Sequence, residues 1–149
     1  MPDVAPKLMR DGAIVEDRWQ ATDIQSLEAW LALPDKAGTA VQLEPDQPPA
    51  PLLAHLAEIE LVAINFITFM DGRGFSYARE LRDHGFAGEL RAVGGFIPDQ
   101  LHYLQRCGFD SFEIAGEVDL EDALAQLSAF SEHYQASADK PQPLFRRRL

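Results

Sequence analysis

The run Leu61-Val62-Ala63-Ile64 is apolar at every position, and it decides the fold that the sequence predicts. A continuous apolar run of this length is typical of a strand that is buried on both faces, as in a parallel sheet. Similar short runs lie on both sides of it, separated by amphipathic stretches of ten or more residues. The predicted strands are residues 40–43, 61–66, 89–93 and 111–114. This alternation predicts an α/β domain with a mainly parallel sheet.

The stretches that accompany these strands have apolar residues at helical spacing. The predicted helices are residues 51–59, 75–84, 98–107 and 120–133. Pro98 suits the first turn of a helix, and Gly85 and Gly108 suit the positions just after helix ends. About four consecutive βα units fit either part of a (β/α) barrel or a flavodoxin-like sheet, because both use right-handed crossovers. We favour the half-barrel-like sheet, with an N-terminal hairpin covering one edge and a homodimer as a way of completing it.

The residues before the first predicted strand follow another pattern. The turn Arg10-Asp11-Gly12 lies between the short apolar pieces 8–9 and 13–15, and an Asp-Gly pair in that setting predicts a β-hairpin. Apolar residues then recur at helical spacing between positions 27 and 33. They predict one short helix, with Thr22 or Asp23 as its N-cap.

Length and composition narrow the class of protein. A chain of 149 residues, 46% of them hydrophobic, fits one folded domain, which we assign to residues 1–137, followed by a flexible basic tail at residues 138–149. The net charge of −11 repels polyanions, so nucleic acid is disfavoured as a partner. The sequence has neither a secretory signal nor an apolar run long enough to span a bilayer, which predicts a cytoplasmic protein that does not bind a membrane.

The cysteine and histidine content argues against a metal centre. The single cysteine, Cys107, excludes an internal disulfide and any metal site built from several thiolates of one chain. It lies at the end of a predicted helix, where the helix dipole opposes a thiolate, so a buried structural thiol is favoured over a nucleophile. The four histidines lack the spacing of paired ligands, and no metal site is predicted.

The richest candidate site is the loop Asp71-Gly72-Arg73-Gly74. Loops that leave the carboxyl ends of parallel strands gather at one edge of the sheet, and ligands bind there. The glycines permit a positive φ or a close backbone approach, and the Arg73 guanidinium beside a helix amino end suits an anion. The alternative is an Asp-Gly turn with a solvated arginine.

Further residues extend this candidate site. Gly94 and Gly95 precede another helix amino end, but the third glycine and the Lys-Ser/Thr pair of nucleotide-binding loops are missing. Asp99 shares a helix face with His102 or Tyr103, as an acid/base pair or as local packing. The candidate anion- or partner-binding residues are Asp71, Gly72, Arg73, Gly74, Ser76, Arg79, Arg82, Gly94 and Asp99.

The basic residues near this edge are of one kind. Between Lys36 and Lys140 every basic residue other than histidine is an arginine. Arginine binds carboxylates and oxoanions through two parallel hydrogen bonds, which favours a binding role. Arg79 and Arg82, one helical turn apart and beside acidic residues, equally suit a salt-bridged helix surface.

Several of these motifs occur together in a known family. The stretches FMDGRGFSYARELR (69–82), GFAGELRAVG (85–94), DQL (99–101) and RCGFD (106–110), with RDG and EDRW near the N-terminus, resemble the bacterial family called domain of unknown function 934. This chain departs from the family pattern at three positions. The family commonly has Pro where this chain has Ile67, Thr or Ser where it has Met70, and Asp where it has Gly95. The positions that match it are Asp71, Arg73, Ser76, Arg79 and Arg82.

The resemblance implies a role beside sulfite reduction. Members of the family are typically encoded next to assimilatory sulfite reductase and are often described as probable oxidoreductases. No flavin, nicotinamide, siroheme or iron–sulfur motif occurs in this chain, so no cofactor of its own is predicted. We therefore expect an accessory protein that binds sulfite reductase, another sulfur-assimilation enzyme, or a small anion.

Two other functions remain open from the sequence. One is a small enzyme in which Arg73 and Arg79 hold an anionic substrate and Asp71 or Asp99 moves a proton. The other is a structural interaction protein in which the loop only shapes the fold.

Overall fold

A single sheet organises the part of the chain that the computed structural model describes, residues 7–10, 13–68, 72–95, 100–114 and 125. In these ranges seven strands follow the order β2-β1-β7-β6-β5-β4-β3. The strands are β1 (Lys7–Arg10), β2 (Ala13–Val15), β3 (Ile24–Ser26), β4 (Thr39–Leu43), β5 (Ile59–Phe66), β6 (Glu89–Gly94) and β7 (Ser111–Ile114). The four strands predicted by apolar runs are β4 to β7, and all four are confirmed.

The sheet is mostly parallel. Strands β3 to β7 run parallel, and neighbours in this part of the sheet are also neighbours in the sequence. Successive units of a (β/α) barrel are ordered in this way, whereas a flavodoxin-like sheet changes direction beside its first strand. At the other end β1 pairs antiparallel with β7 and with β2, so the predicted N-terminal hairpin is confirmed; its Asp11-Gly12 turn lies outside the described residues.

The helices lie near the predicted positions, but their bounds and types differ from the prediction. The α-helices are α1 (Leu27–Leu31), α2 (Arg73–Asp83) and α3 (Leu101–Cys107), and short 3₁₀ helices lie at η1 (Ala21–Asp23) and η2 (Ala50–His55). Gly85 and Gly108, which follow α2 and α3, have φ angles of 93° and 119°, as expected for helix ends. The predicted helix at residues 120–133 and the predicted tail at residues 138–149 lie outside the described ranges, apart from Ala125.

Two helix predictions were wrong. The first helix begins at Leu27, capped by Ser26, whose Oγ accepts a hydrogen bond from the Ala29 N–H at 3.2 Å; Thr22 and Asp23 lie before it in η1. Residues 24–26 are instead taken up by β3, which pairs with β4. The region predicted as a helix at residues 51–59 forms only the 3₁₀ helix η2, and β5 already begins at Ile59. The pairing of Ile59 with Thr39 on β4 assigns the end of this region to the sheet.

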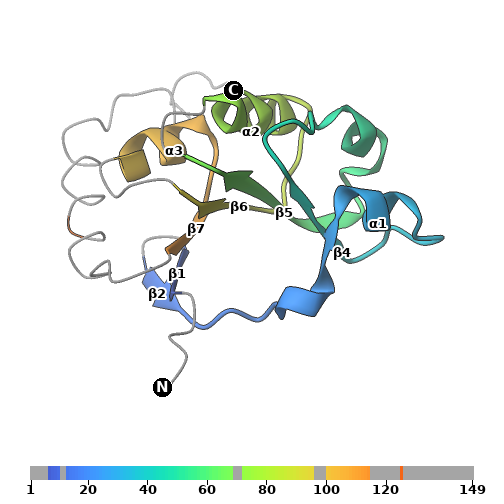
Figure 1. The fold of residues 1–149 in the computed structure, drawn as a ribbon, viewed down its shortest axis with the longest axis horizontal. Coiled ribbons are helices and arrows are strands. Elements are labelled where there is room, and N and C mark those ends of the chain that lie inside the picture. The colour runs from blue at the N-terminus through green and yellow to red at the C-terminus, as the bar shows by residue number, and fades with distance from the viewer. Residues whose placement is uncertain (1–6, 11–12, 69–71, 96–99, 115–124, 126–149) are drawn as a thin grey trace.

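The two faces of the sheet differ in chemistry. Figure 1 shows the strands along an arc with α1, α2 and α3 on its outer side. On that side the side chains of β4, β5 and β6 pack against the helices in one core, which includes Trp30, Val62, Phe66, Leu81 and Leu90. The run 61–64 is fully buried, as predicted. None of the helices in the described ranges has the length and apolar character that a membrane span requires.

The opposite face of the sheet, called the inner face below, carries polar side chains on β6, β7 and β1. In register across it lie Ala63 on β5, Arg91 on β6, Ser111 on β7 and Arg10 on β1. Residues in register on neighbouring strands point to the same side. Since Leu90 and Ala92 point into the helix-covered core, their neighbours Glu89 and Arg91 belong to the inner face.

Candidate functional site

The predicted site residues lie mainly along α2 and at the end of β6. Gly72 is the N-cap residue of α2, and Arg73, Gly74, Ser76, Arg79 and Arg82 follow within the helix. Gly94 is the last residue of β6. Asp71 and Asp99 lie outside the described residues, so their predicted roles stay predictions. The start of α2 and the end of β6 both belong to the carboxyl edge of the sheet, the edge at which the parallel strands end.

The glycines at this edge serve close packing. Gly74 is buried, and a Cβ atom there would lie 2.6 Å from Cζ of Phe66. Gly94 has a φ of 96°, and Gly95 donates its N–H to the carbonyl oxygen of Phe66. Gly72 has an ordinary φ of −89°, so the predicted positive φ in this loop is not found at that residue. The glycines at 74, 94 and 95 let α2 and the chain after β6 approach the end of β5.

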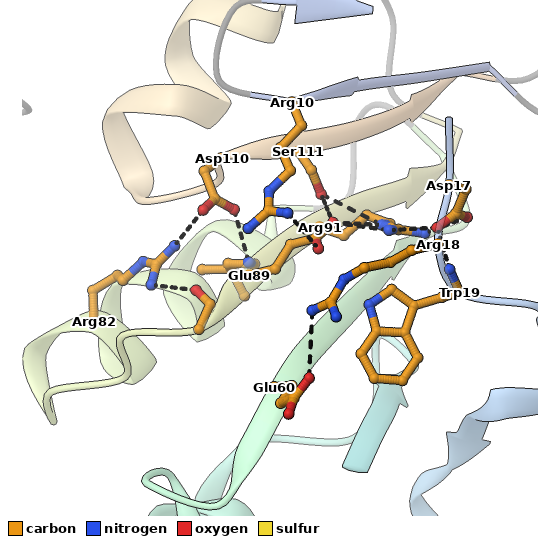
Figure 2. A network of polar contacts seen from close by, with 12 residues as sticks. Arg10, Asp17, Arg18, Trp19, Glu60, Arg82, Glu89, Arg91, Asp110 and Ser111 are labelled. Atoms are coloured by element: carbon orange, nitrogen blue, oxygen red, sulfur yellow. Dashed lines mark hydrogen bonds and ion pairs between the residues drawn. The ribbon is translucent and has the colours of Figure 1, made fainter. Parts of the chain in front are cut away.

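Arg82 does not belong to the carboxyl edge, contrary to its place in the predicted set. Its guanidinium donates hydrogen bonds to three backbone carbonyl oxygens, those of Phe86 (2.9 Å), Gly88 (3.0 Å) and Gly108 (2.9 Å). It also lies 3.7 Å from the carboxylate of Asp110 (Figure 2). Nine residues of helix separate it from Arg73, a rise of about 14 Å. Arg82 therefore joins the loops at the amino ends of β6 and β7.

The carboxyl edge exposes an apolar and aromatic surface beside its arginines. Ile67, just after β5, is 62% exposed, and Tyr103 on α3 is 47% exposed. The ring of Tyr103 contacts Phe75 on α2, with ring centroids 4.9 Å apart, and Phe75 in turn contacts the buried Phe66. Arg73, Ser76 and Arg79 on α2 are exposed. We call Ile67, Arg73, Phe75 and Tyr103, together with Arg79 further along α2, the carboxyl-edge patch.

A carboxylate at the same edge was missed by the sequence analysis. Glu44 directly follows β4, and its two carboxylate oxygens accept hydrogen bonds from Asn65 Nδ2 (2.7 Å) and Gln42 Nε2 (2.9 Å). Tyr77 on α2 fixes the adjoining loop by donating its hydroxyl to the carbonyl oxygen of Pro45 at 2.6 Å. The signal was present, because an acidic residue immediately after a buried parallel strand is placed where ligands bind.

A second missed feature is a network of ion pairs and hydrogen bonds on the inner face, formed by Asp17, Glu89, Arg91, Ser111 and Glu113. Figure 2 shows the first four of these residues. Arg91 is 1% exposed and Glu89 is 2% exposed. Arg91 binds both carboxylate oxygens of Asp17, at 2.8 and 3.0 Å, and contacts Glu89 Oε2 at 2.8 Å. Ser111 Oγ donates to the same Glu89 oxygen at 2.8 Å. Glu113 lies 3.6 Å from Arg91.

This inner-face network has a clear structural effect. Three carboxylates surround one buried guanidinium, so the buried cation has several charged partners. The bond to Asp17 ties the segment after β2 to β6, which is 74 residues away along the chain. In the sequence Arg91 stood out only as one of several arginines. The alternation of Glu89 and Arg91 with Leu90 and Ala92 was the available signal for two charges on the non-core side of a buried strand.

The pKa values of two carboxyl groups in the network shift in opposite directions. Burial raises the pKa of Asp17, but the Arg91 hydrogen bond, the Trp19 N–H and the charges of Arg91 and Arg18 outweigh it, so this pKa lies below its ordinary value. Burial also raises the pKa of Glu113; Arg91 lowers it and the Asp17 charge raises it, and the net result is a raised pKa. Arg91 therefore stabilises the ionised form of Asp17 more than that of Glu113.

These shifts predict opposite effects of pH on stability. The lowered pKa of Asp17 stabilises the fold above its unfolded pKa, and this contribution is lost as the pH falls below about 4. The raised pKa of Glu113 has the reverse sign: stability falls as the pH rises from about 4.5 through the raised pKa. At neutral pH, Asp17→Asn should be less stable than wild type, whereas Glu113→Gln should be at least as stable.

Urea unfolding at several pH values measures both effects. The loss of unfolding free energy in Asp17→Asn relative to wild type should shrink below about pH 4. Any gain of unfolding free energy in Glu113→Gln should shrink as the pH falls towards about 4.5. A Glu113→Gln variant that is clearly less stable than wild type at neutral pH would contradict the assignment.

Comparison with known proteins gives a family and no described activity. The chain matches the family described as "Bacterial protein of unknown function (DUF934)" over residues 40–145. No curated protein and no solved structure matches it significantly. The matched range includes β4 from Ala40 onward, β5 to β7, α2, α3 and the carboxyl-edge patch. Because the match spans most of its 149 residues, the chain belongs to the DUF934 family of bacterial proteins.

Proposed function

We propose that this protein is an accessory component of assimilatory sulfite reduction that docks onto a reductase through the carboxyl-edge patch. The association with sulfite reduction comes from the family resemblance, through the genes that typically lie beside its members. The observation that carries the docking role is the patch itself, in which exposed Ile67 and Tyr103 lie at the same edge as exposed Arg73, and exposed Arg79 follows six residues further along α2.

The composition of the patch favours a protein partner. Protein interfaces are enriched in tyrosine, other aromatic residues and arginine, and they are depleted in lysine. Tyr103 and Phe75 supply a rigid aromatic contact, and no lysine occurs between Lys36 and Lys140. The whole chain has a net charge of −11, so a local group of arginines would orient the approach of a partner with an acidic docking surface.

A co-purification experiment tests this proposal. The tagged chain is mixed with the sulfite reductase of the same organism, and the Kd is measured for wild type, Ile67→Asp and Leu31→Asp. Leu31 on α1 is 51% exposed and lies outside the patch, so it is the matched control for Ile67. We expect Ile67→Asp to weaken binding by about tenfold or more, as for a central interface residue, and Leu31→Asp to leave it unchanged.

Two results would contradict the proposal. If wild type does not bind the reductase and deletion causes no growth defect on sulfate, the accessory role is wrong. If binding occurs but Ile67→Asp and Leu31→Asp behave alike, the docking surface lies elsewhere.

A small enzyme is the second candidate, and Glu44 is the observation that favours it. Its carboxylate lies at the carboxyl edge, oriented by two amide donors, where it is placed to exchange a proton with a bound substrate. Arg73 and the first turn of α2 are suited to hold an anionic substrate such as sulfite. Thermal shifts with sulfite, sulfate and phosphate test this function: Arg73→Ala should abolish a shift seen in wild type, and equal shifts in both proteins would exclude Arg73 as the anion-binding residue.

A further inference from the structure

A hollow lies at the amino ends of β5 and β6, at the edge of the sheet opposite to the carboxyl-edge patch. Its volume is about 560 Å³, within the range of small-molecule sites. Its polar walls are Arg10, Arg18, Glu60, Glu89 and Asp110, and its apolar walls include Leu56, Ile59 and Ala87. Three acidic and two basic residues thus line one space.

Two of these carboxylates are already engaged by the fold. Asp110 accepts the Leu90 N–H at 2.8 Å and lies 3.7 Å from the Arg82 guanidinium. Glu89 accepts hydrogen bonds from Arg91 and Ser111 at 2.8 Å each. Their charges are compensated by Arg82 and Arg91, which do not line the hollow; Arg10, which does, also lies 3.6 Å from Glu89. The carboxylate that remains for a ligand is Glu60.

Glu60 and Arg18 form a loose pair at the mouth of the hollow. Arg18 Nη2 lies 3.4 Å from Glu60 Oε1, and both side chains are at least half exposed. A charge-assisted hydrogen bond between such groups is normally about 2.7–2.9 Å long, so this pair is not closed. Arg18 is held by its own neighbour, because its guanidinium stacks 4.9 Å from the centre of the Trp19 ring. Figure 2 shows Arg18 extended over the sheet towards Glu60, with Arg10 nearby.

We propose that this hollow binds a free α-amino acid. The ligand carboxylate inserts beside the Arg18 guanidinium, with Arg10 as the second cation, and its ammonium group binds Glu60. The loose ion pair is thereby replaced by two closer ones, one at each end of the zwitterion. The ligand side chain then packs against Leu56, Ile59 and Ala87.

The charges in the hollow favour a zwitterion over a simple ion. A plain anion bound by Arg18 would take that cation away from Glu60 and leave a carboxylate next to the ligand's own negative charge. A plain cation bound by Glu60 would likewise take that carboxylate away from Arg18 and leave a guanidinium next to the ligand's own positive charge. A ligand that carries both charges restores a partner to each side chain.

Ligand-observed NMR with the full chain tests the proposal. The twenty protein amino acids are screened singly at about 10 mM, a concentration that nearly saturates a site with a Kd of about 1 mM. The best binder is then compared with its analogue lacking the amino group and with its analogue lacking the carboxyl group. We expect the amino acid to bind and each analogue to bind at least about tenfold more weakly, because each loses one of two charge-assisted contacts.

Matched variants separate this site from the rest of the molecule. Glu60→Gln and Arg18→Met should each weaken binding by about tenfold or more, as expected for loss of one charged contact. Glu58→Gln is the control, since the Glu58 side chain is 48% exposed, close to the 50% of Glu60, and does not line the hollow. Glu60→Gln and Arg18→Met each remove one member of an exposed ion pair, so the fold should tolerate them.

The outcomes are decisive in each case. No binding by any of the twenty amino acids overturns the proposal, as does an analogue that binds as tightly as its parent. Equal effects of Glu60→Gln and Glu58→Gln would also overturn it. Because the hollow and the carboxyl-edge patch lie at opposite edges of the sheet, Ile67→Asp should not change amino acid binding, and failure of either proposal leaves the other intact.

Discussion

Replacing Arg91 by methionine should lower the free energy of unfolding by about 3–5 kcal/mol, the range for breaking a buried ion pair by removing one partner. Arg91 is 1% exposed and supplies the cation for Glu89, which is itself 2% exposed. Without it, the partners that Glu89 keeps among the described residues are the Ser111 hydroxyl and the Arg10 guanidinium, whose Nη1 lies 3.6 Å away. Asp17 loses both of its bonds to β6. Chemical unfolding followed by circular dichroism measures the change.

Two further variants show whether the lost stability comes from the buried charge. Arg18→Met removes an arginine of the same region that is 58% exposed, and its effect should stay within about 0.5 kcal/mol. The double variant Arg91→Met with Glu89→Leu removes both members of the buried pair and should recover part of the loss. If Arg91→Met and Arg18→Met destabilise equally, Arg91 does not hold the inner face together.

Replacing Arg82 by methionine should cost about 2–4 kcal/mol of unfolding free energy, because hydrogen bonds to a charged group contribute about 1.5–3 kcal/mol each and are not additive. Its guanidinium bridges the carbonyl oxygens of Phe86, Gly88 and Gly108. Burial lowers the pKa of Arg82 and the Asp110 charge opposes this, as expected for a cation withdrawn from water. The variant leaves these carbonyl groups without their donor.

Arg79→Met is the matched control for Arg82→Met. Arg79 lies on the same helix, one turn earlier, and is exposed, so its replacement should change stability by no more than about 0.5 kcal/mol. Under the docking proposal Arg79→Met should instead weaken binding to the reductase. The same unfolding and binding measurements on both variants separate the two arginines. Equal losses of stability would show that Arg82 has no special structural role.

The sequence predicted the strands well because their signal is local. Each of β4 to β7 has a short series of apolar residues, either continuous as in β5 or alternating with polar residues as in β7, that can be recognised without a distant partner. The strand β3 has only three residues, Ile24–Ser26, and is defined by its pairing with β4. Nothing in so short a segment distinguishes a strand from the start of a helix. Tertiary pairing decided its structure, and the helix N-cap moved to Ser26 as a result.

The candidate site was harder to predict than the fold. The sequence analysis placed Arg73, Arg79 and Arg82 in one set because they are close in the sequence. It did not show that α2 carries Arg82 to the opposite edge of the sheet. The contact between Asp17 and Arg91 joins residues 74 positions apart, and no local pattern indicates it. Glu44 and the pair Glu89 and Arg91 could have been found by asking which side of each strand a polar residue occupies.

The pairing of the N-terminal hairpin with β7 has a consequence for how the chain folds. Leu8 on β1 lies opposite Glu113 on β7, so the two partners are separated by about 100 residues of chain, and contacts between such distant residues form slowly. During synthesis β1 leaves the ribosome before the described strands β3 to β6, whereas its partner β7 leaves after them. The parallel strands β3 to β6 can assemble before the hairpin pairs with β7. Although the hairpin strands precede β3 to β6 in the chain, we expect them to join the sheet later, and their docking covers the edge of β7.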